Sequence, residues 1–368
     1  MYVSYAILLL LTLDFSQAQG DVCIPVASNL SQPDSGNDIA AIDAALRQCG
    51  EGGTILIPSS KLYQIGAPLD LSPCHGCTIQ VDGTLNVSTV DKSLWYNQPA
   101  IFQLSGASNI VMNGTGLING NTFSNVYQKP NTMFSITSAS QIRISGLTLR
   151  SPATNFFVIR NSQDIQFSSL SLATNLDPNA PVSYSSWIKG FEIVDSSHIG
   201  ISSQTSITGV AFCVLVGEGV NSTSVSNLSC AGSESGVFID LTSSKYLDIH
   251  LANLSFTNLT IVDAYRATGI RDTAGTTTAE NVTWENVQVR KTWVAAYVEN
   301  CVGSGCGGGI NGARFQFQNF SFVGIEGPTR IMKSLWSCPF KEGLFIPRDQ
   351  DAVKVNFLLI TPSSLHNE

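Results

Sequence analysis

Charged residues and histidine are scarce in this chain of 368 residues. Asp, Glu, Lys and Arg together make up only 12% of the sequence, whereas Gly, Ser, Thr and Asn are abundant. This composition is typical of a β protein rich in turns and argues against a coiled coil or a disordered chain. The formal net charge of −8 at pH 7 argues against non-specific nucleic-acid binding, so no nucleic-acid partner is expected.

Long hydrophobic segments are also missing. The apolar run Ala6–Leu13 is too short to span a bilayer and no later segment is long enough, so no membrane partner is expected. The run precedes Ser16-Gln17-Ala18, which resembles a signal-peptide cleavage site, although the residues before the run lack charge. We therefore expect a signal peptide over residues 1–18, one mature domain over residues 19–368, and secretion from the cell.

Helical periodicity is missing from most of the chain. It occurs once, over Asn37–Gln48, where Asn37 can cap the first turn and Gly50 follows the last. Apolar residues fall on one face of this predicted helix, and an apolar strand, Thr54–Pro58, comes next. A short amphipathic helix ahead of stacked strands is what a solenoid needs to cover its open end.

The remaining sequence consists of short β-branched runs between turns rich in Ser, Asn and Gly. In each repeat a polar pair precedes an apolar–x–apolar strand. The starts of successive repeats lie 23 to 34 residues apart, as from Ile142 to Ile165 and from Ile165 to Ile199. This period predicts an all-β solenoid, in which one coil cannot bury its face alone. A propeller, the competing fold, needs longer blades and a more regular period. The repeats begin at Ser108-Asn109-Ile110, Ser140-Gln141-Ile142, Gln163-Asp164-Ile165, Ser197-His198-Ile199, Thr223-Ser224-Val225, Leu247-Asp248-Ile249 and Glu280-Asn281-Val282.

Nine cysteines in a chain with a predicted signal peptide indicate disulfides formed in an oxidising compartment. Cys74 and Cys77 have the spacing of half a zinc site, but no second pair has metal spacing, which favours a local disulfide and no metal. A further pair can fasten the predicted helix, and another brackets a Gly-rich turn. The predicted pairs are Cys23–Cys49, Cys74–Cys77 and Cys301–Cys306.

Nine Asn-x-Ser/Thr sequons accompany the predicted signal peptide. Such sequons arise often by chance in a chain rich in Asn, Ser and Thr, but together with the signal they favour a secreted glycoprotein. They lie at Asn29, Asn86, Asn113, Asn221, Asn227, Asn253, Asn258, Asn281 and Asn319.

Several stretches resemble glycoside hydrolase family 28, the polygalacturonase family, and in particular its fungal exopolygalacturonase and xylogalacturonan-hydrolase-like members. These stretches are Gln48–Ile65, Ser72–Ser88 and Asn113–Asn121, and the similarity extends into the 280s. The resemblance implies a single right-handed parallel β-helix with its substrate cleft on one sheet. It implies inverting hydrolysis of α-1,4-galacturonosyl linkages without a metal or other cofactor. It also implies a Cys213–Cys230 disulfide, and it leaves Cys338 unpaired because the cysteine usual in the family a few residues later is absent.

The catalytic motifs of that family are Asn-Thr-Asp, Asp-Asp, Gly-His-Gly and Arg-Ile-Lys on successive coils, and this sequence departs from each of them. Lys189 stands where the first motif has its aspartate, and the histidine of the third motif is absent, with Glu234 near its place. In chain order, the motif positions carry Trp187-Ile188-Lys189, Glu192, Ala211-Phe212, Glu234 and Arg271.

These replacements bear directly on the reaction. Inverting glycosidases use one carboxylic acid to protonate the leaving oxygen and a carboxylate across the cleft to activate a water. That mechanism cannot run here unless other acids have moved in. Two functions stay open, a polygalacturonase-type hydrolase and a non-catalytic, pectin-binding pseudoenzyme; a purely structural wall glycoprotein would lack a basic cleft. The candidate carboxylates are Glu192, Asp195, Glu218, Glu234 and Asp240.

Sugar carboxylates need compensating positive charge in an otherwise acidic protein. Lys189 and Arg271 are the cations at the motif positions, and we expect them on neighbouring coils, with Trp187 beside the first. The expected ligand is a galacturonan-type pectic polysaccharide of the cell wall, and the protein is expected to be a monomer. Other aromatic residues able either to stack on sugars or to pack on the coils are Trp95, Tyr96, Trp284, Trp293 and Trp336.

Overall fold

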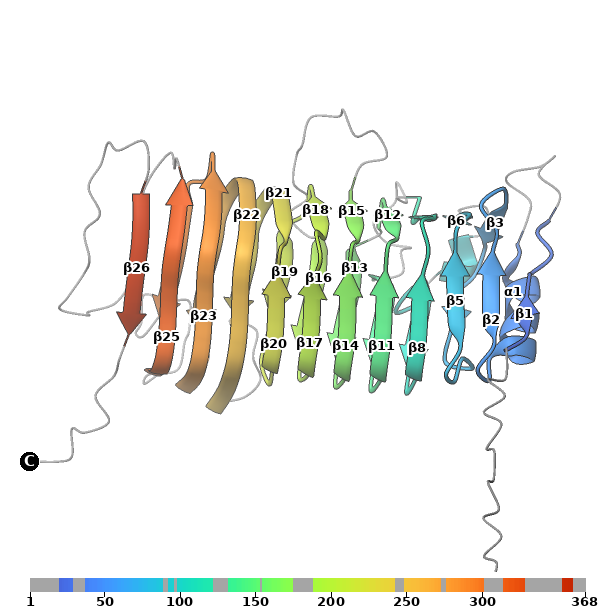
Figure 1. The fold of residues 1–368 in the computed structure, drawn as a ribbon, viewed down its shortest axis with the longest axis horizontal. Coiled ribbons are helices and arrows are strands. Elements are labelled where there is room, and N and C mark those ends of the chain that lie inside the picture. Colours follow the sequence, from blue (N-terminus) through green and yellow to red (C-terminus); the bar gives the residue numbers. More distant parts are fainter. Residues whose placement is uncertain are drawn as a thin grey trace, which may run out of the picture.

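The computed structural model describes residues 20–28, 37–88, 92–95, 98–121, 132–152, 154–174, 188–241, 248–272, 276–300, 314–327 and 353–359. Through these ranges the chain winds into a right-handed parallel β-helix, which confirms the predicted solenoid. Figure 1 shows the coils side by side along the long axis, from α1 at one end to β26 at the other.

Successive strands of a coil fall into three parallel sheets, because most strands pair with the strand three places further along the chain. Sheet 1 contains β4 (Leu69–Asp70), β7 (Phe102–Ser105), β10 (Thr132–Thr137), β13 (Asn155–Arg160), β16 (Lys189–Val194), β19 (Phe212–Val216) and β24 (Val294–Asn300). Sheet 2 contains β1 (Val22–Cys23), β2 (Thr54–Ile57), β5 (Thr78–Val81), β8 (Ser108–Asn113), β11 (Ser140–Ser145), β14 (Gln163–Ser168), β17 (Ser197–Ser202) and β20 (Asn221–Ser226). Sheet 3 contains β3 (Leu62–Ile65), β6 (Thr84–Val87), β9 (Leu117–Asn119), β12 (Thr148–Arg150), β15 (Ser171–Ala173) and β18 (Ser206–Thr208).

Toward the C-terminal end of the helix the strands run through the corners between sheets. These long strands are β21 (Ser229–Asp240), β22 (Asp248–Asp272), β23 (Thr276–Arg290) and β25 (Arg314–Gly327). The last parts of β21 and β22 therefore belong to sheet 1, where β21 pairs with β19 and β22 pairs with β24. The final strand, β26 (Val353–Leu359), runs antiparallel to β25.

The predicted helix covers the N-terminal end of the coils as α1 (Ile39–Cys49). Its N-cap is Asp38 rather than Asn37, although Asn37 Oδ1 accepts a hydrogen bond from the Ile39 N–H at 3.2 Å. The buried Asp38 carboxylate instead accepts the backbone N–H groups of Ser28 and Gln64, each at 2.6 Å. It thereby ties the cap to the first coil, a use of the side chain that local sequence does not show.

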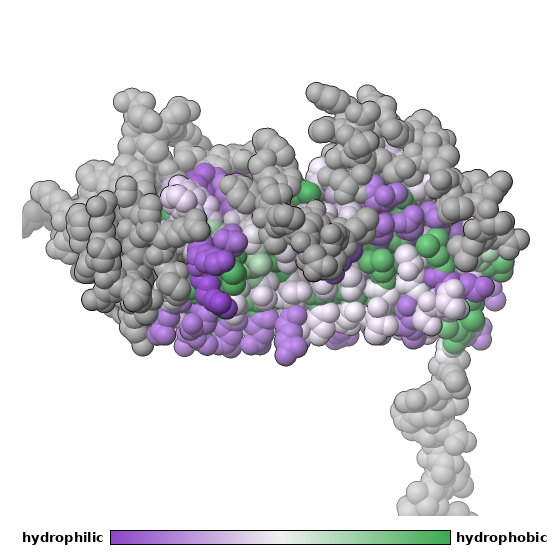
Figure 2. Space-filling model, turned by 90° about the horizontal axis from the view of Figure 1, so that it is seen from above, coloured by the Kyte–Doolittle hydropathy of each residue, from purple (hydrophilic) through white to green (hydrophobic). Residues whose placement is uncertain are grey.

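Columns of stacked side chains fill the interior. Phe102, Phe134, Phe157 and Phe191 occupy equivalent positions of sheet 1, are fully buried, and stack with ring centroids 4.7 to 5.0 Å apart. Each coil can bury its rings only against its neighbours, so the stack depends on the whole solenoid. On the outside, hydrophilic residues line one long edge of the described surface in Figure 2, and hydrophobic residues show as patches between paler ones.

The repeated polar pair marks the turn into sheet 2. Its second member takes a left-handed backbone conformation in coil after coil, as at Asn109, Asp164 and Asn281, with φ of 53° to 58°. Asn and Asp tolerate this region because their short side chains bond locally. The pattern thus reports a real constraint of the fold.

Two of the predicted repeats are out of register. The turn pair is Asn221-Ser222 rather than Thr223-Ser224, because Thr223 takes the buried position of Ile199 and bonds the Asn221 carbonyl. The next coil starts its repeat at Ala252-Asn253, not at Leu247-Asp248-Ile249. In this coil β22 begins at Asp248, before the turn pair. Its buried residues Ile249 and Leu251 have the same apolar–x–apolar spacing as the start of a repeat.

Three of the predicted disulfides are confirmed, namely Cys23–Cys49, Cys74–Cys77 and Cys213–Cys230. Cys301, Cys306 and Cys338 lie outside the described residues, as do residues 1–18. In the described part of the chain, no helix is long and apolar enough to cross a membrane. Five sequon asparagines are exposed: Asn221, Asn227, Asn253, Asn258 and Asn281.

Two other sequon asparagines of the described chain, Asn86 and Asn113, are half-buried. The Asn86 amide donates to Gln64 Oε1 at 3.1 Å and accepts from Asn119 Nδ2 at 2.8 Å, in a half-buried ladder on sheet 3. Asn113 is half-buried at the end of β8, and the side chains of Asn29 and Asn319 lie outside the described part.

Candidate functional site

The first motif segment lies on the outer face of sheet 1. Lys189 begins β16, in register with Asn155 of β13 and Phe212 of β19. Its backbone N–H donates to Asn155 Oδ1 at 3.2 Å, which fixes the start of the strand against the previous coil. Trp187, predicted beside it, lies outside the described residues.

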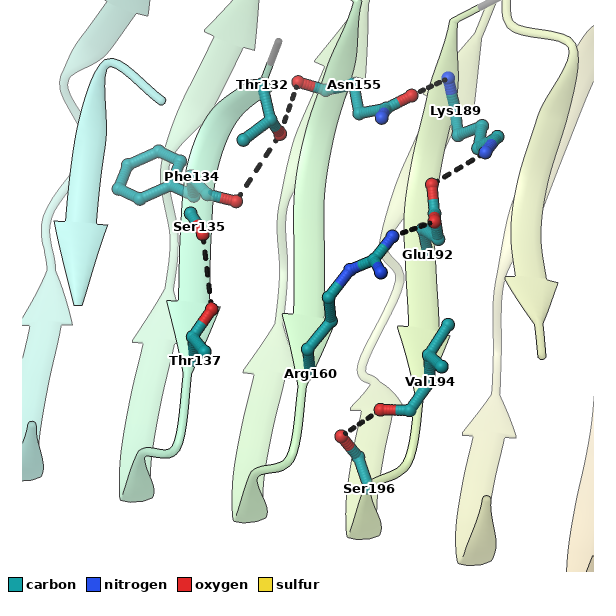
Figure 3. A network of polar contacts seen from close by, with 10 residues as sticks. All are labelled: Thr132, Phe134, Ser135, Thr137, Asn155, Arg160, Lys189, Glu192, Val194 and Ser196. Atoms are coloured by element: carbon teal, nitrogen blue, oxygen red, sulfur yellow. Dashed lines mark hydrogen bonds and ion pairs between the residues drawn. The ribbon is translucent and has the colours of Figure 1, made fainter. Parts of the chain in front are cut away.

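Glu192 holds two cations on this face. Its carboxylate accepts from Lys189 Nζ at 2.6 Å and from Arg160 of the preceding coil at 2.7 Å. Figure 3 shows Lys189 reaching this carboxylate from the same strand and Arg160 reaching it from the adjacent strand. The Glu192 side chain is only 12% exposed, whereas that of Arg160 is 50% exposed. The cluster therefore has one more positive than negative charge, with a guanidinium open to solvent.

The second motif position contains no acid or base. Ala211 is buried, and its backbone bonds Ile188 O at 2.6 Å and Ser235 N at 2.7 Å across two neighbouring coils. Phe212 is half-buried and packs against a cluster on the outer face formed by Phe238, Val294 and Tyr297. The surface here is aromatic and hydrocarbon, so it cannot take a proton from water.

The third motif position brings Glu234 together with Arg266 of the next coil. Ser235, in register with Phe212, pairs across to Arg266 of β22. The Arg266 guanidinium lies 3.3 Å from Glu234 Oε1 and 3.5 Å from the Ser235 hydroxyl. It also lies 5.0 to 5.8 Å from the ring centroids of Tyr297, Tyr265 and Phe238. Cation–π contacts of this kind favour a cation that is partly removed from water.

Arg266 was not singled out from the sequence. It follows Lys189, Phe212 and Ser235 in the same row of sheet 1, one coil after another. Finding it requires the strand register, because the motif-like tripeptide Gly269-Ile270-Arg271 nearby draws attention instead.

Arg271 lies elsewhere. It is in register with Asp240 and Glu299, and its guanidinium reaches the Asp240 carboxylate at 2.5 Å. Relative to Lys189 it is three coils along the helix, about 14 Å, and five residues along the strand, about 17 Å. The structure does not bring Lys189 and Arg271 together; the neighbouring cations on this face are Lys189 and Arg160.

Asp195 and Glu218 lie in the turns that follow the neighbouring strands β16 and β19 of sheet 1. The Asp195 N–H donates to the Glu218 carbonyl at 2.8 Å, which joins the two turns. Burial raises the pKa of the Asp195 carboxyl, and the charge of Glu218 raises it further, against the opposing effect of Arg160. This pair differs from Glu192, Glu234 and Asp240, each of which is held by a cation.

The predicted aromatic residues separate into two groups. Trp95 and Trp284 are fully buried and pack within the coils. Trp293 is 42% exposed and directly precedes β24. Tyr96 and Trp336 lie outside the described residues. Among the described side chains, no group of three or more His, Cys, Asp or Glu is placed to hold a metal ion.

The fold defines a parallel β-helix protein, and the row of charged and aromatic side chains across sheet 1 is its candidate functional face. The chain belongs to glycosyl hydrolases family 28, which it matches over residues 49–336. The Neosartorya fischeri protein named "Probable endo-xylogalacturonan hydrolase A" is 31% identical over 300 residues, covering 77% of this chain and 71% of that protein. Endo-xylogalacturonan hydrolase A of Aspergillus tubingensis is 29% identical over 299 residues, covering 77% and 71%.

Solved structures share the fold. The crystal structure of endo-xylogalacturonan hydrolase from Aspergillus tubingensis matches with a TM-score of 0.70 and 27% identity, over 82% of this chain and 84% of that one. A hyperthermoactive exopolygalacturonase from Thermotoga maritima matches with a TM-score of 0.52 over 89% of this chain and 92% of that one. At 11% identity this second likeness shows the fold alone.

Proposed function

We propose that this protein binds anionic, galacturonan-type pectic glycans along sheet 1 and does not hydrolyse them by the two-carboxylate mechanism of its family. The observation that carries the proposal is the row Lys189, Phe212, Ser235 and Arg266, which contains no carboxylate. A pectic ligand follows from the family and from the names of the relatives, which state activity on xylogalacturonan.

The argument against hydrolysis rests on charge. Inversion needs a protonated carboxylic acid and an ionised carboxylate about 6.5–9.5 Å apart, with room for a water between them. Glu192, Glu234 and Asp240, on the described face of sheet 1, each accept from at least one Lys or Arg. Protonating any of them would leave its cation without this counter-charge. Phe212 adds a hydrophobic surface where a water would have to be activated.

The case for binding rests on Lys189 and Arg160. They share one carboxylate, so a second carboxylate, that of a uronate residue, can approach the solvent-exposed Arg160 side. Charge-assisted contacts of this type are worth about 1.5–3 kcal/mol each when well formed. Arg271 stays proposed as a further ligand contact on the same sheet, and Trp187, outside the described residues, stays proposed as another ligand contact.

The wider setting is part of the same proposal. Residues 1–18 act as a signal peptide, residues 19–368 form the single mature domain, and the product is an extracellular, monomeric glycoprotein. Disulfides are consistent with that oxidising compartment. A Cys301–Cys306 disulfide and a free Cys338 complete the scheme.

The test is to incubate the purified protein with polygalacturonic acid and with xylogalacturonan. Reducing ends report hydrolysis, and affinity electrophoresis in gels containing each polymer reports binding. Retarded migration that weakens with added salt, without new reducing ends, supports the proposal. Hydrolysis by the parent that Glu234→Gln abolishes would overturn it and assign Glu234 the role of acid or base.

Hydrolysis by displaced acids is the second candidate function, and the Asp195–Glu218 pair favours it. The two residues are joined by a backbone hydrogen bond between adjacent coils of sheet 1, and burial raises the pKa of the Asp195 carboxyl, the direction that a general acid needs. If the parent releases reducing ends and Asp195→Asn stops this while Glu234→Gln does not, this candidate replaces the first.

A further inference from the structure

Tyr265 and Trp293 are the exposed large aromatic side chains of the described chain, at 45% and 42% exposure. They lie on adjacent coils, one residue ahead of the register pair Arg266 and Val294 in sheet 1. Their ring centroids are 6.2 Å apart and their planes are inclined by 41°. Two rings in contact with each other but open to solvent leave apolar surface available to a ligand.

The two rings are held in place from the protein side. The Trp293 N–H donates to the Ala264 carbonyl at 3.1 Å, which joins the two coils beneath them. The Arg266 guanidinium lies 5.1 Å from the Tyr265 ring centroid and is itself bonded to Glu234. Aromatic side chains positioned in advance lose little conformational freedom when they bind.

The charge around this pair indicates which part of a glycan it suits. Arg266 is matched by Glu234, so the ring pair presents aromatic surface without an excess of positive charge. The cluster of Arg160, Lys189 and Glu192, in contrast, carries an excess. The C–H face of an uncharged pyranose therefore suits Tyr265 and Trp293, and a uronate suits the Arg160 cluster.

The two places lie along one line of the sheet. Arg266 follows Lys189 in the same row, three strands further along. Parallel strands are about 4.7–4.9 Å apart, so this separation is about 14 Å, within reach of a short oligosaccharide lying along the helix axis. We propose that Tyr265 and Trp293 form a second contact for the proposed pectic ligand, one that takes neutral sugar residues of a substituted galacturonan.

Calorimetric titration with xylogalacturonan and with polygalacturonic acid tests this inference, which rests on the proposed function. Tyr265→Ala and Trp293→Ala should each weaken xylogalacturonan binding about three- to tenfold. The same variants should change polygalacturonic acid binding less than about twofold. Val323→Ala, which truncates a side chain 40% exposed on β25, is the matched control and should bind like the parent.

Tryptophan fluorescence supplies a readout that does not depend on how the Ala variants fold. Xylogalacturonan should shift the tryptophan emission of the parent protein. The Trp293→Phe variant should still bind xylogalacturonan but should show a smaller shift, because Trp293 no longer contributes to it. Unchanged xylogalacturonan affinity in both Ala variants, with Lys189→Ala still weakening it, overturns the inference but leaves the proposed function standing. Equal losses for both polymers overturn the assignment to neutral sugars. A parent protein that binds neither polymer overturns both proposals.

Discussion

Replacing Glu192 with Gln is expected to strengthen anionic-glycan binding while weakening the fold. The side chain keeps its shape but loses the charge that holds Lys189 at 2.6 Å and Arg160 at 2.7 Å. Hydrogen bonds to charged groups contribute about 1.5–3 kcal/mol in buried settings. Arg160 is half exposed and regains water, so a loss of about 1–2 kcal/mol in unfolding free energy is expected after solvent screening.

The gain in binding follows from Coulomb's law. A uronate carboxylate bridging Arg160 and Lys189 would lie about 5 Å from the Glu192 carboxylate, where like charges repel by roughly 1–3 kcal/mol for effective dielectric constants between 80 and 20. Removing that repulsion is expected to raise affinity about 5- to 150-fold at low salt. The gain should shrink as salt is added, because the Debye length is only about 8 Å at physiological ionic strength.

Calorimetric titration with an oligogalacturonate at two salt concentrations measures this effect. The matched control is Glu285→Gln, which removes the same charge from an exposed position on β23, away from sheet 1. Net charge alone would raise the affinity of both variants equally. Equal gains, or unchanged affinity in a Glu192→Gln protein that melts cooperatively, would refute the assignment of the uronate contact to Lys189 and Arg160.

Three other predictions concern the fold. Phe157→Ala should lower unfolding free energy by about 3–5 kcal/mol, because its fully buried ring stacks on both sides; a denaturant midpoint equal to that of the parent would contradict this. Burial raises the pKa of the Asp195 carboxyl, so the folded protein binds the carboxyl proton more tightly than the unfolded chain does. The protonated carboxyl therefore stabilises the fold below the ordinary pKa of 3.8, and this stabilisation is lost as pH rises through the raised pKa. Asp195→Asn should therefore reduce the fall of Tm above about pH 4. Thiol labelling of the denatured, non-reduced protein should mark one cysteine, Cys338; several labelled cysteines would contradict the disulfide scheme.

Local sequence determined the architecture. The recurring polar pair before an apolar strand predicted the solenoid, since a left-handed residue at each turn and an inward-facing apolar residue after it are local requirements. The N-terminal helix, from its apolar face, and the Cys74–Cys77 pair, from its short spacing, were visible for the same reason. The absence of acids at Ala211 and Phe212 was likewise visible directly.

Register was decided by the stacked coils. Thr223 occupies a core position because it can bond its own turn, so a hydrophobic pattern alone missed that repeat. Arg266 was missed for a related reason. Its position in the row with Lys189, Phe212 and Ser235 depends on the lengths of the loops between the strands, which the hydrophobic pattern does not give.

The pairing of side chains on the functional face was decided only in three dimensions. Arg160 and Glu192 are 32 residues apart in the chain, yet their charged groups lie 2.7 Å apart because β13 and β16 are adjacent. Tyr265 and Trp293 meet in the same way across β22 and β24. Which side chains meet between coils depends on how the strands stack, and the loops between those strands differ in length. The local periodicity of the sequence therefore does not specify these pairs.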